Sequence, residues 1–263
     1  MRLLIGCATA FLLIGCAAPT ATPEPASASP VTVEPTRPLS PAVTAPAPSV
    51  SANRTVTFTT LDGATLHGTL YGSGRTAVIF STMGAQREAT WAKTAQATAD
   101  AGYLALTYNF RFWVSATKIQ DNLRAFVADD LRAAMAFARE QGAQQIVLVG
   151  ASLGGMATAK VGGEAQAAAV IIMAAPLSAR GLTVQIEEAE LQALTMPKLF
   201  VGTDHDAVVA PAATRRVYDL APEPKEIYLY PGTAHGTELF ETQSAADLTQ
   251  RLLAFISAHA PAN

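Results

Sequence analysis

The spacing of hydrophobic residues divides the chain after residue 52 into short strands and amphipathic helices. At 56–71, apolar and polar residues alternate around Asp62-Gly63, a turn signal, which predicts an antiparallel hairpin. Six later runs are short and mostly apolar without clean alternation, which is typical of parallel strands buried on both faces. These runs are 77–80, 104–108, 146–149, 170–173, 199–201 and 227–230.

Segments with helical spacing separate these runs. From Ile119 to Ala138, apolar residues recur at intervals of three and four, which predicts one amphipathic helix of about five turns. Shorter helices are predicted at 91–101, 187–191, 211–220 and 248–256. The alternation of strands and helices predicts an α/β fold with a doubly wound, mostly parallel, eight-stranded sheet and an antiparallel N-terminal hairpin. Ligands of such folds bind at the carboxyl ends of the strands.

The N-terminus has the character of a secretion signal. Met1-Arg2 is positive, and 3–14 is apolar or small throughout but shorter than the roughly 20 residues that span a bilayer. The signal peptide is predicted at 1–15. Its end, Leu13-Ile14-Gly15-Cys16, resembles the lipobox of bacterial lipoproteins, which implies cleavage before Cys16 and a lipid on its thiol. The alternative is an ordinary secretory signal cut near Ala17 or Ala18.

Residues 16–52 form a predicted linker between this anchor and a globular domain at 53–263. Nine of the sixteen prolines of the chain lie here, among Ala, Ser, Thr and Val. Proline removes a hydrogen-bond donor and restricts φ, so the segment is expected to be an extended tether. A lipid at Cys16 would hold the domain on a bacterial membrane, outside the cytoplasm.

Composition and charge narrow the function classes. The net charge is −3, only 15% of residues are charged, and no basic run suggests nucleic acid. The two cysteines are Cys7 and Cys16, so the predicted domain has neither a disulfide framework nor a thiolate metal site. The sequence leaves the oligomeric state open.

The stretch Gly150-Ala151-Ser152-Leu153-Gly154 follows a predicted strand and precedes a small-residue segment that is compatible with a helix. This is the form of a nucleophile elbow, in which a sharp turn exposes the serine Oγ at the top of the sheet. Side chains at the two outer glycines would collide with the neighbouring strand and helix. The Leu153 amide would begin the helix, where negative charge is favoured.

A serine nucleophile needs a base, and the base needs an orienting carboxylate. His235 lies in a glycine-flanked loop after the last predicted strand and is the predicted base. Two aspartates compete in the loop after the preceding strand. Asp206 directly precedes the turn into the next helix and is preferred, whereas Asp204 is nearer the strand end and could cap the turn instead.

The order Ser152, Asp206, His235 resembles the α/β-hydrolase family, whose triad follows Ser, Asp, His along the chain. Further matching stretches are 81–84, 101–106, 150–155, 202–206 and 231–236, closest in character to the serine-esterase or dienelactone-hydrolase-like branch. The resemblance implies an oxyanion hole made by the Met83 and Leu153 amides and no metal or organic cofactor. Thr82 stands where this family often has histidine.

An aromatic run follows the strand 104–108. Phe110, Phe112 and Trp113 are predicted to line a substrate pocket, the alternative being that they pack on the following helix. Arg111 would either contact an anionic substrate group or pair with an acid. The stretch 174–196 has room for a helix but for no large cap domain, which predicts an open cleft.

These features predict a serine hydrolase that cleaves small-molecule carboxylic esters through an acyl-enzyme, tethered to a membrane outside the cytoplasm. A peptidase or amidase of the same fold is one alternative. A binding lipoprotein that kept the fold without catalysis is the other.

Overall fold

The computed structural model describes residues 53–114, 118–179 and 181–262. The predicted signal peptide at 1–15, the linker at 16–52 and the lipidation site at Cys16 lie outside the described residues and stay predictions. Within the described part of the chain, no helix is long and apolar enough to cross a membrane.

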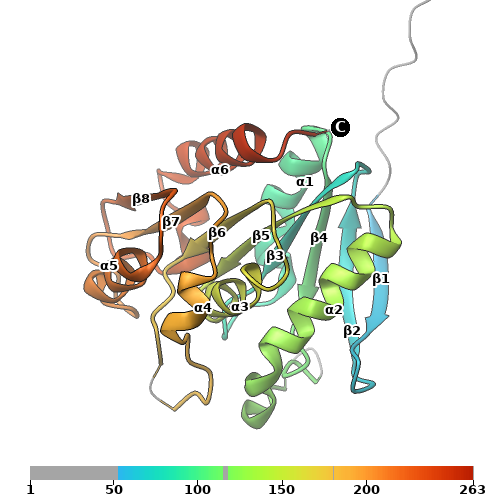
Figure 1. Cartoon of the computed structure of the whole chain (residues 1–263), viewed down its shortest axis with the longest axis horizontal. Helices are drawn as coiled ribbons and strands as arrows, with labels where there is room; N and C mark the ends of the chain where they lie inside the picture. Colours follow the sequence, from blue (N-terminus) through green and yellow to red (C-terminus); the bar gives the residue numbers. More distant parts are fainter. Residues whose placement is uncertain (1–52, 115–117, 180, 263) are drawn as a thin grey trace, which may run out of the picture. The chain divides into compact units, whose positions relative to one another are not determined.

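The described residues contain one eight-stranded sheet in the order β1-β2-β4-β3-β5-β6-β7-β8 (Figure 1). β1 and β2 form the predicted antiparallel hairpin, which closes around Asp62-Gly63, and β2 is also antiparallel to β4. All other neighbours are parallel, so the predicted fold class is confirmed. The strands are β1 (Arg54–Thr59), β2 (Thr65–Tyr71), β3 (Thr76–Ser81), β4 (Leu104–Asn109), β5 (Gln145–Ala151), β6 (Ala169–Met173), β7 (Lys198–Thr203) and β8 (Lys225–Tyr230).

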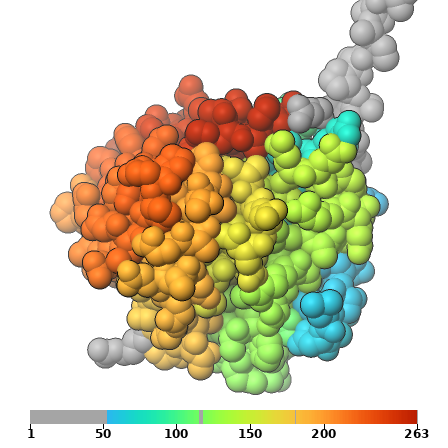
Figure 2. Space-filling view, in the orientation of Figure 1, coloured from blue at the N-terminus to red at the C-terminus, as the bar shows by residue number. Residues whose placement is uncertain are grey.

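Helices cover both faces of the sheet, which explains the lack of alternation in the parallel strands. In β5, Ile146 and Leu148 join the core on one face, and Val147 and Val149 join the core on the other. The first face is covered by α2 (Val127–Glu140), α3 (Leu153–Gly162), α4 (Glu188–Gln192) and α5 (Pro211–Leu220). The second is covered by α1 (Ala92–Asp100) and α6 (Ala245–His259). Figure 2 shows α2 in yellow-green and the α4–α5 region in orange at the surface.

The helix predicted from Ile119 to Ala138 is shorter than expected. Residues Asp121–Phe126 form a 3₁₀ segment, η2, and the α-helix begins only at Val127. Ile119 instead forms an isolated antiparallel bridge with Trp113. The reason is burial, since no residue of η2 is buried whereas most of α2 packs on the core. Tertiary packing, which supplies most of the stability of a helix, therefore starts about two turns later than the apolar spacing suggests.

The connection between β6 and β7 carries only α4 and loops among its described residues, so no large cap covers the carboxyl edge of the sheet there. The loops after β3, β5, β7 and β8 meet at this edge. These loops contain the residues predicted to form the catalytic triad and the oxyanion hole.

Candidate active site

Ser152 lies between β5 and α3 in a conformation that is rare for a residue with a side chain. Its φ is 51° and its ψ is −114°. A positive φ in a residue other than glycine stores strain, which persists only when the surroundings hold it. Here the Ser152 amide donates to the Met173 carbonyl over 2.8 Å, and the Ser152 carbonyl accepts from the Met156 amide over 2.9 Å. The turn is therefore clamped to β6 and to the first turn of α3.

Glycines permit the close packing of this turn. A Cβ on Gly150 would overlap the Gly154 carbonyl, and a Cβ on Gly154 would overlap the Ser81 and Thr82 carbonyls. The sequence-based reason for these two glycines, collision with the neighbouring strand and helix, agrees with these contacts. The second overlap also shows that the start of α3 lies directly against the end of β3.

His235 and Asp206 form a buried pair. The Nδ1 atom of His235 lies 2.9 Å from Oδ2 and 3.1 Å from Oδ1 of Asp206. The Oδ1 atom also accepts the amides of Val208 and Val209, each over 2.8 Å. Burial opposes ionisation of Asp206, but the hydrogen bonds from His235, Val209 and Val208 outweigh it, so its pKa is below the usual value. An ionised Asp206 holds the proton of His235 on Nδ1 and leaves Nε2 as the basic atom.

Asp204, in the same loop, makes different contacts. Its Oδ1 accepts the Gly232 amide over 2.8 Å and lies 2.8 Å from Nδ1 of the exposed His205. It therefore ties the loop after β7 to the loop after β8. Of these two aspartates, Asp206 is the one in contact with His235.

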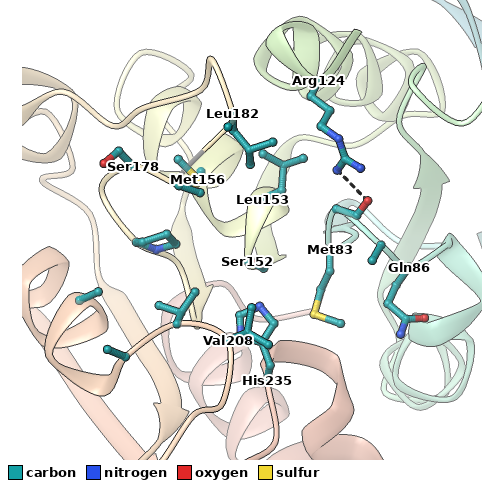
Figure 3. A pocket seen from close by; sticks show the side chains of 18 of the residues that line it. Met83, Gln86, Arg124, Ser152, Leu153, Met156, Ser178, Leu182, Val208 and His235 are labelled. Carbon is teal, nitrogen blue, oxygen red and sulfur yellow. Dashed lines mark hydrogen bonds between the residues drawn. The ribbon is translucent and has the colours of Figure 1, made fainter. Parts of the chain in front are cut away.

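Ser152 and His235 line the same cavity of about 850 Å³. Figure 3 shows them at its centre, with Met83 beside them. The His235 amide donates to the exposed Glu238 carboxylate over 3.0 Å, which helps to orient the loop that carries the imidazole. Asp206 does not line the cavity and lies behind the histidine, the position that an orienting carboxylate requires.

The predicted oxyanion donors also border this cavity. Met83, after β3, and Leu153, the first residue of α3, both line it, and the packing of Gly154 on Thr82 brings their segments together. Among the described residues, neither the Met83 nor the Leu153 amide has a hydrogen-bond acceptor. Two unpaired backbone donors beside a serine suit a developing negative charge. The Thr82 hydroxyl is buried and likewise has no partner within the described chain.

The aromatic run does not form the pocket that was predicted for it. Phe110 and Phe112 are fully buried in the core, and neither they nor Trp113 line the cavity. They lie just past the end of β4 and pack towards α2, which was the alternative. Trp113 is partly buried, and its Nε1 donates to the Gln86 carbonyl over 3.1 Å, so it supports the loop after β3 from behind.

Arg111 pairs with acidic side chains, which was the alternative to contacting an anionic substrate group. Its Nε lies 2.5 Å from the buried carboxylate of Asp130, and its two Nη atoms bind Asp62. These ion pairs join the β1–β2 turn, the end of β4 and α2, and they leave Arg111 outside the cavity lining.

Several residues of the cavity wall were not singled out from the sequence. They come from five separate segments, and no local pattern marks them, because only the meeting of these segments gives them a common surface. They include Gln86, Arg124, Met156, Ser178, Leu182 and Val208. In the described chain, no group of three or more His, Cys, Asp or Glu residues is arranged to hold a metal ion.

The fold places the chain among doubly wound α/β proteins whose site lies at the carboxyl edge of the sheet. A family model described as an alpha/beta hydrolase domain matches residues 76–257, more than half of the chain. The chain therefore belongs to the alpha/beta-hydrolase family. A search of curated proteins found no match.

Solved esterase structures share this fold at low sequence identity. The esterase domain of a Rhodothermus marinus protein is 20% identical with a TM-score of 0.64, and the match covers 79% of this chain and 98% of that one. A Pyrococcus furiosus esterase is 15% identical with a TM-score of 0.64, covering 79% and 92%. An esterase from a Rhodococcus species is 15% identical with a TM-score of 0.64, covering 78% and 99%. At these identities the likeness is one of fold.

Proposed function

We propose that this protein is a serine hydrolase that cleaves carboxylic esters through an acyl-enzyme. The observation that carries the proposal is the placement of Ser152, on a strained turn, in the same cavity as His235, whose Nδ1 is held by Asp206. A serine hydroxyl is a weak nucleophile until an adjacent base takes its proton. The family and its esterase neighbours support the choice of an ester substrate.

The steps follow from these positions. Ser152 Oγ attacks the ester carbonyl carbon while its proton passes to Nε2 of His235. The Met83 and Leu153 amides stabilise the negative oxygen, a contribution worth roughly 100- to 1000-fold in kcat for each such donor. His235 then returns the proton to the alcohol oxygen, and the C–O bond breaks. A water molecule then attacks the acyl carbon and gives one proton to His235. The bond between the acyl carbon and Ser152 Oγ breaks, His235 returns the proton to Oγ, and the acid leaves.

Fluorophosphonate labelling combined with a substrate panel tests this proposal. We expect a fluorophosphonate to label Ser152, located by mass spectrometry, and 4-nitrophenyl esters to be hydrolysed faster than aminoacyl 4-nitroanilides. Faster anilide cleavage would instead indicate the peptidase or amidase alternative. A folded protein that stays unlabelled and binds acyl compounds without turnover would favour the non-catalytic binding lipoprotein.

We further propose that the mature protein begins at a lipidated Cys16 and is tethered to a bacterial membrane outside the cytoplasm. The support is the apolar segment at 3–14, the resemblance of 13–16 to a lipobox and the proline-rich linker. An alkyne-bearing fatty acid supplied to expressing cells should label the wild-type chain, and Cys16→Ser should remove the label. Cys7→Ser is the matched control and should keep it. Equal labelling of all three chains, or of none, would contradict the anchor.

A further inference from the structure

The cavity has two chemically different sides. Figure 3 shows Met156, Leu182 and Val208 on one side of Ser152, and Arg124 and Gln86 towards the other. The first side suits an alkyl or aryl group, because its walls are mostly apolar, with Ser178 beside Met156 as a polar exception. The second carries a guanidinium, which is the only side chain with a permanent positive charge among the described residues that line this cavity. A neutral aliphatic ester would use the first side alone.

Arg124 is held in place by three contacts, two of which are with other residues of the cavity lining, Gly84 and Asp121. Its Nη1 donates to the Gly84 carbonyl over 2.7 Å, and its Nε donates to Asp121 over 2.9 Å. The guanidinium carbon lies 4.7 Å from the centre of the Phe112 ring, against which the group packs. The side chain is only 13% exposed. A guanidinium fixed in this way loses little conformational freedom when a ligand binds.

Part of the Arg124 guanidinium has no hydrogen-bond partner among the described residues. Within the described chain, its Nη2 forms no hydrogen bond, and Nη1 uses a single acceptor. Its one salt-bridge partner, Asp121, is 84% exposed, so solvent screens most of that interaction. Arg111 provides the contrast, since Asp130 and Asp62 occupy its Nε and both of its Nη atoms. Within the described chain, Arg124 therefore keeps the whole of Nη2 for a ligand, whereas each of the three guanidinium nitrogens of Arg111 already binds a carboxylate.

We infer that Arg124 forms a subsite for an anionic group of the substrate, and that the esters cleaved best carry a carboxylate. A guanidinium binds a carboxylate through charge-assisted hydrogen bonds that neutral groups cannot match. This inference rests on the proposed ester hydrolysis and names the substrate class of that site. It concerns a residue of η2, whereas Ser152, Asp206 and His235 come from loops after β5, β7 and β8.

The test compares esters that differ only in charge. 4-Nitrophenyl hemiglutarate carries the carboxylate on the acyl side, with its methyl ester as the neutral partner. 3-Carboxyphenyl butyrate carries it on the alcohol side, again with its methyl ester as the neutral partner. We expect the wild type to prefer the charged member of at least one pair, and the pair that shows the preference identifies the side that Arg124 faces. The preference should weaken as salt is raised, because it is electrostatic.

Arg124→Gln should lower kcat/KM for that charged ester by about 10- to 100-fold, mainly through KM, as expected for loss of a hydrogen bond to a charged group. The neutral partner should change far less, and Arg124→Lys should keep part of the preference. Arg132→Gln is the control, since Arg132 is exposed, pairs with Asp129 and Glu164, and does not line this cavity.

The outcomes separate this inference from the proposed function. If Arg124→Gln lowers activity on all four esters by one common factor, Arg124 only supports the loop after β3, and the anionic subsite is wrong. A wild type that is labelled by fluorophosphonate but shows no charge preference also overturns the subsite and leaves the serine hydrolase intact. No labelling and no turnover of any ester overturns both. If Arg124→Gln does not fold, the salt dependence of the wild type and the ratios in Arg124→Lys decide the question.

Discussion

Replacing Ser152 by alanine should lower kcat for any ester substrate by about 10⁶-fold and abolish fluorophosphonate labelling. The reason is that the acyl group would have no oxygen to which it could transfer, while the cavity and the backbone donors stay in place. The main-chain hydrogen bonds that clamp the turn, from Ser152 to Met173 and from Met156 to Ser152, do not involve the hydroxyl. The variant should therefore fold, and thermal unfolding should confirm this before kinetics are compared.

Ser178→Ala is the matched control for this experiment. Ser178 lines the same cavity, as Figure 3 shows, but it lies in the β6–β7 connection and not at the strained turn. It should keep both labelling and turnover. Labelling that survives in Ser152→Ala, or that disappears in Ser178→Ala, would show that Ser152 is not the nucleophile. Either result would refute the proposed mechanism.

Replacing Asp206 by asparagine should lower kcat by about 10⁴-fold, whereas Asp204→Asn should leave it close to wild type. An asparagine at 206 cannot favour the required tautomer of His235 or stabilise its protonated form. Asp204 does not touch His235 and only ties two loops together. Steady-state kinetics of the two variants on one 4-nitrophenyl ester make the comparison. Equal losses, or a larger loss for Asp204→Asn, would reverse the assignment.

Asp206 also links stability to pH. Its pKa in the folded protein is lowered because, although burial opposes ionisation, hydrogen bonds from His235 and two amides outweigh it. Its ionisation therefore stabilises the fold above the unfolded-state pKa of about 4, and this contribution disappears as pH falls through the lower folded-state pKa. Urea unfolding of the wild type and of Asp206→Asn should show a smaller difference at the acid end of this range than at pH 7.

Much of the fold could be predicted because the relevant signals are local. The strand runs, the Asp62-Gly63 turn and the Gly150–Gly154 elbow each lie within a few residues, and all have the expected structure. The chain order of Ser152, Asp206 and His235 was also readable, since each follows a predicted strand and such strands end at one edge of the sheet. The helix start at Ile119 was wrong because apolar spacing does not reveal which turns are buried.

The roles of the surrounding residues depended on contacts between distant segments. Asp204 and Asp206 have the same chemistry two positions apart, and only the path of the loop after β8 decides which one reaches His235.

The aromatic run was placed at the right strand end but on the wrong side of it, because the sequence does not show whether a side chain there meets solvent or a helix. Arg124 reaches Gly84 across 40 positions of the chain. The sequence by itself therefore determined which predicted strands the candidate catalytic residues follow, through local periodicity and turn residues. Only the tertiary structure decided which side chains share the cavity, because that follows from packing between segments far apart in the chain.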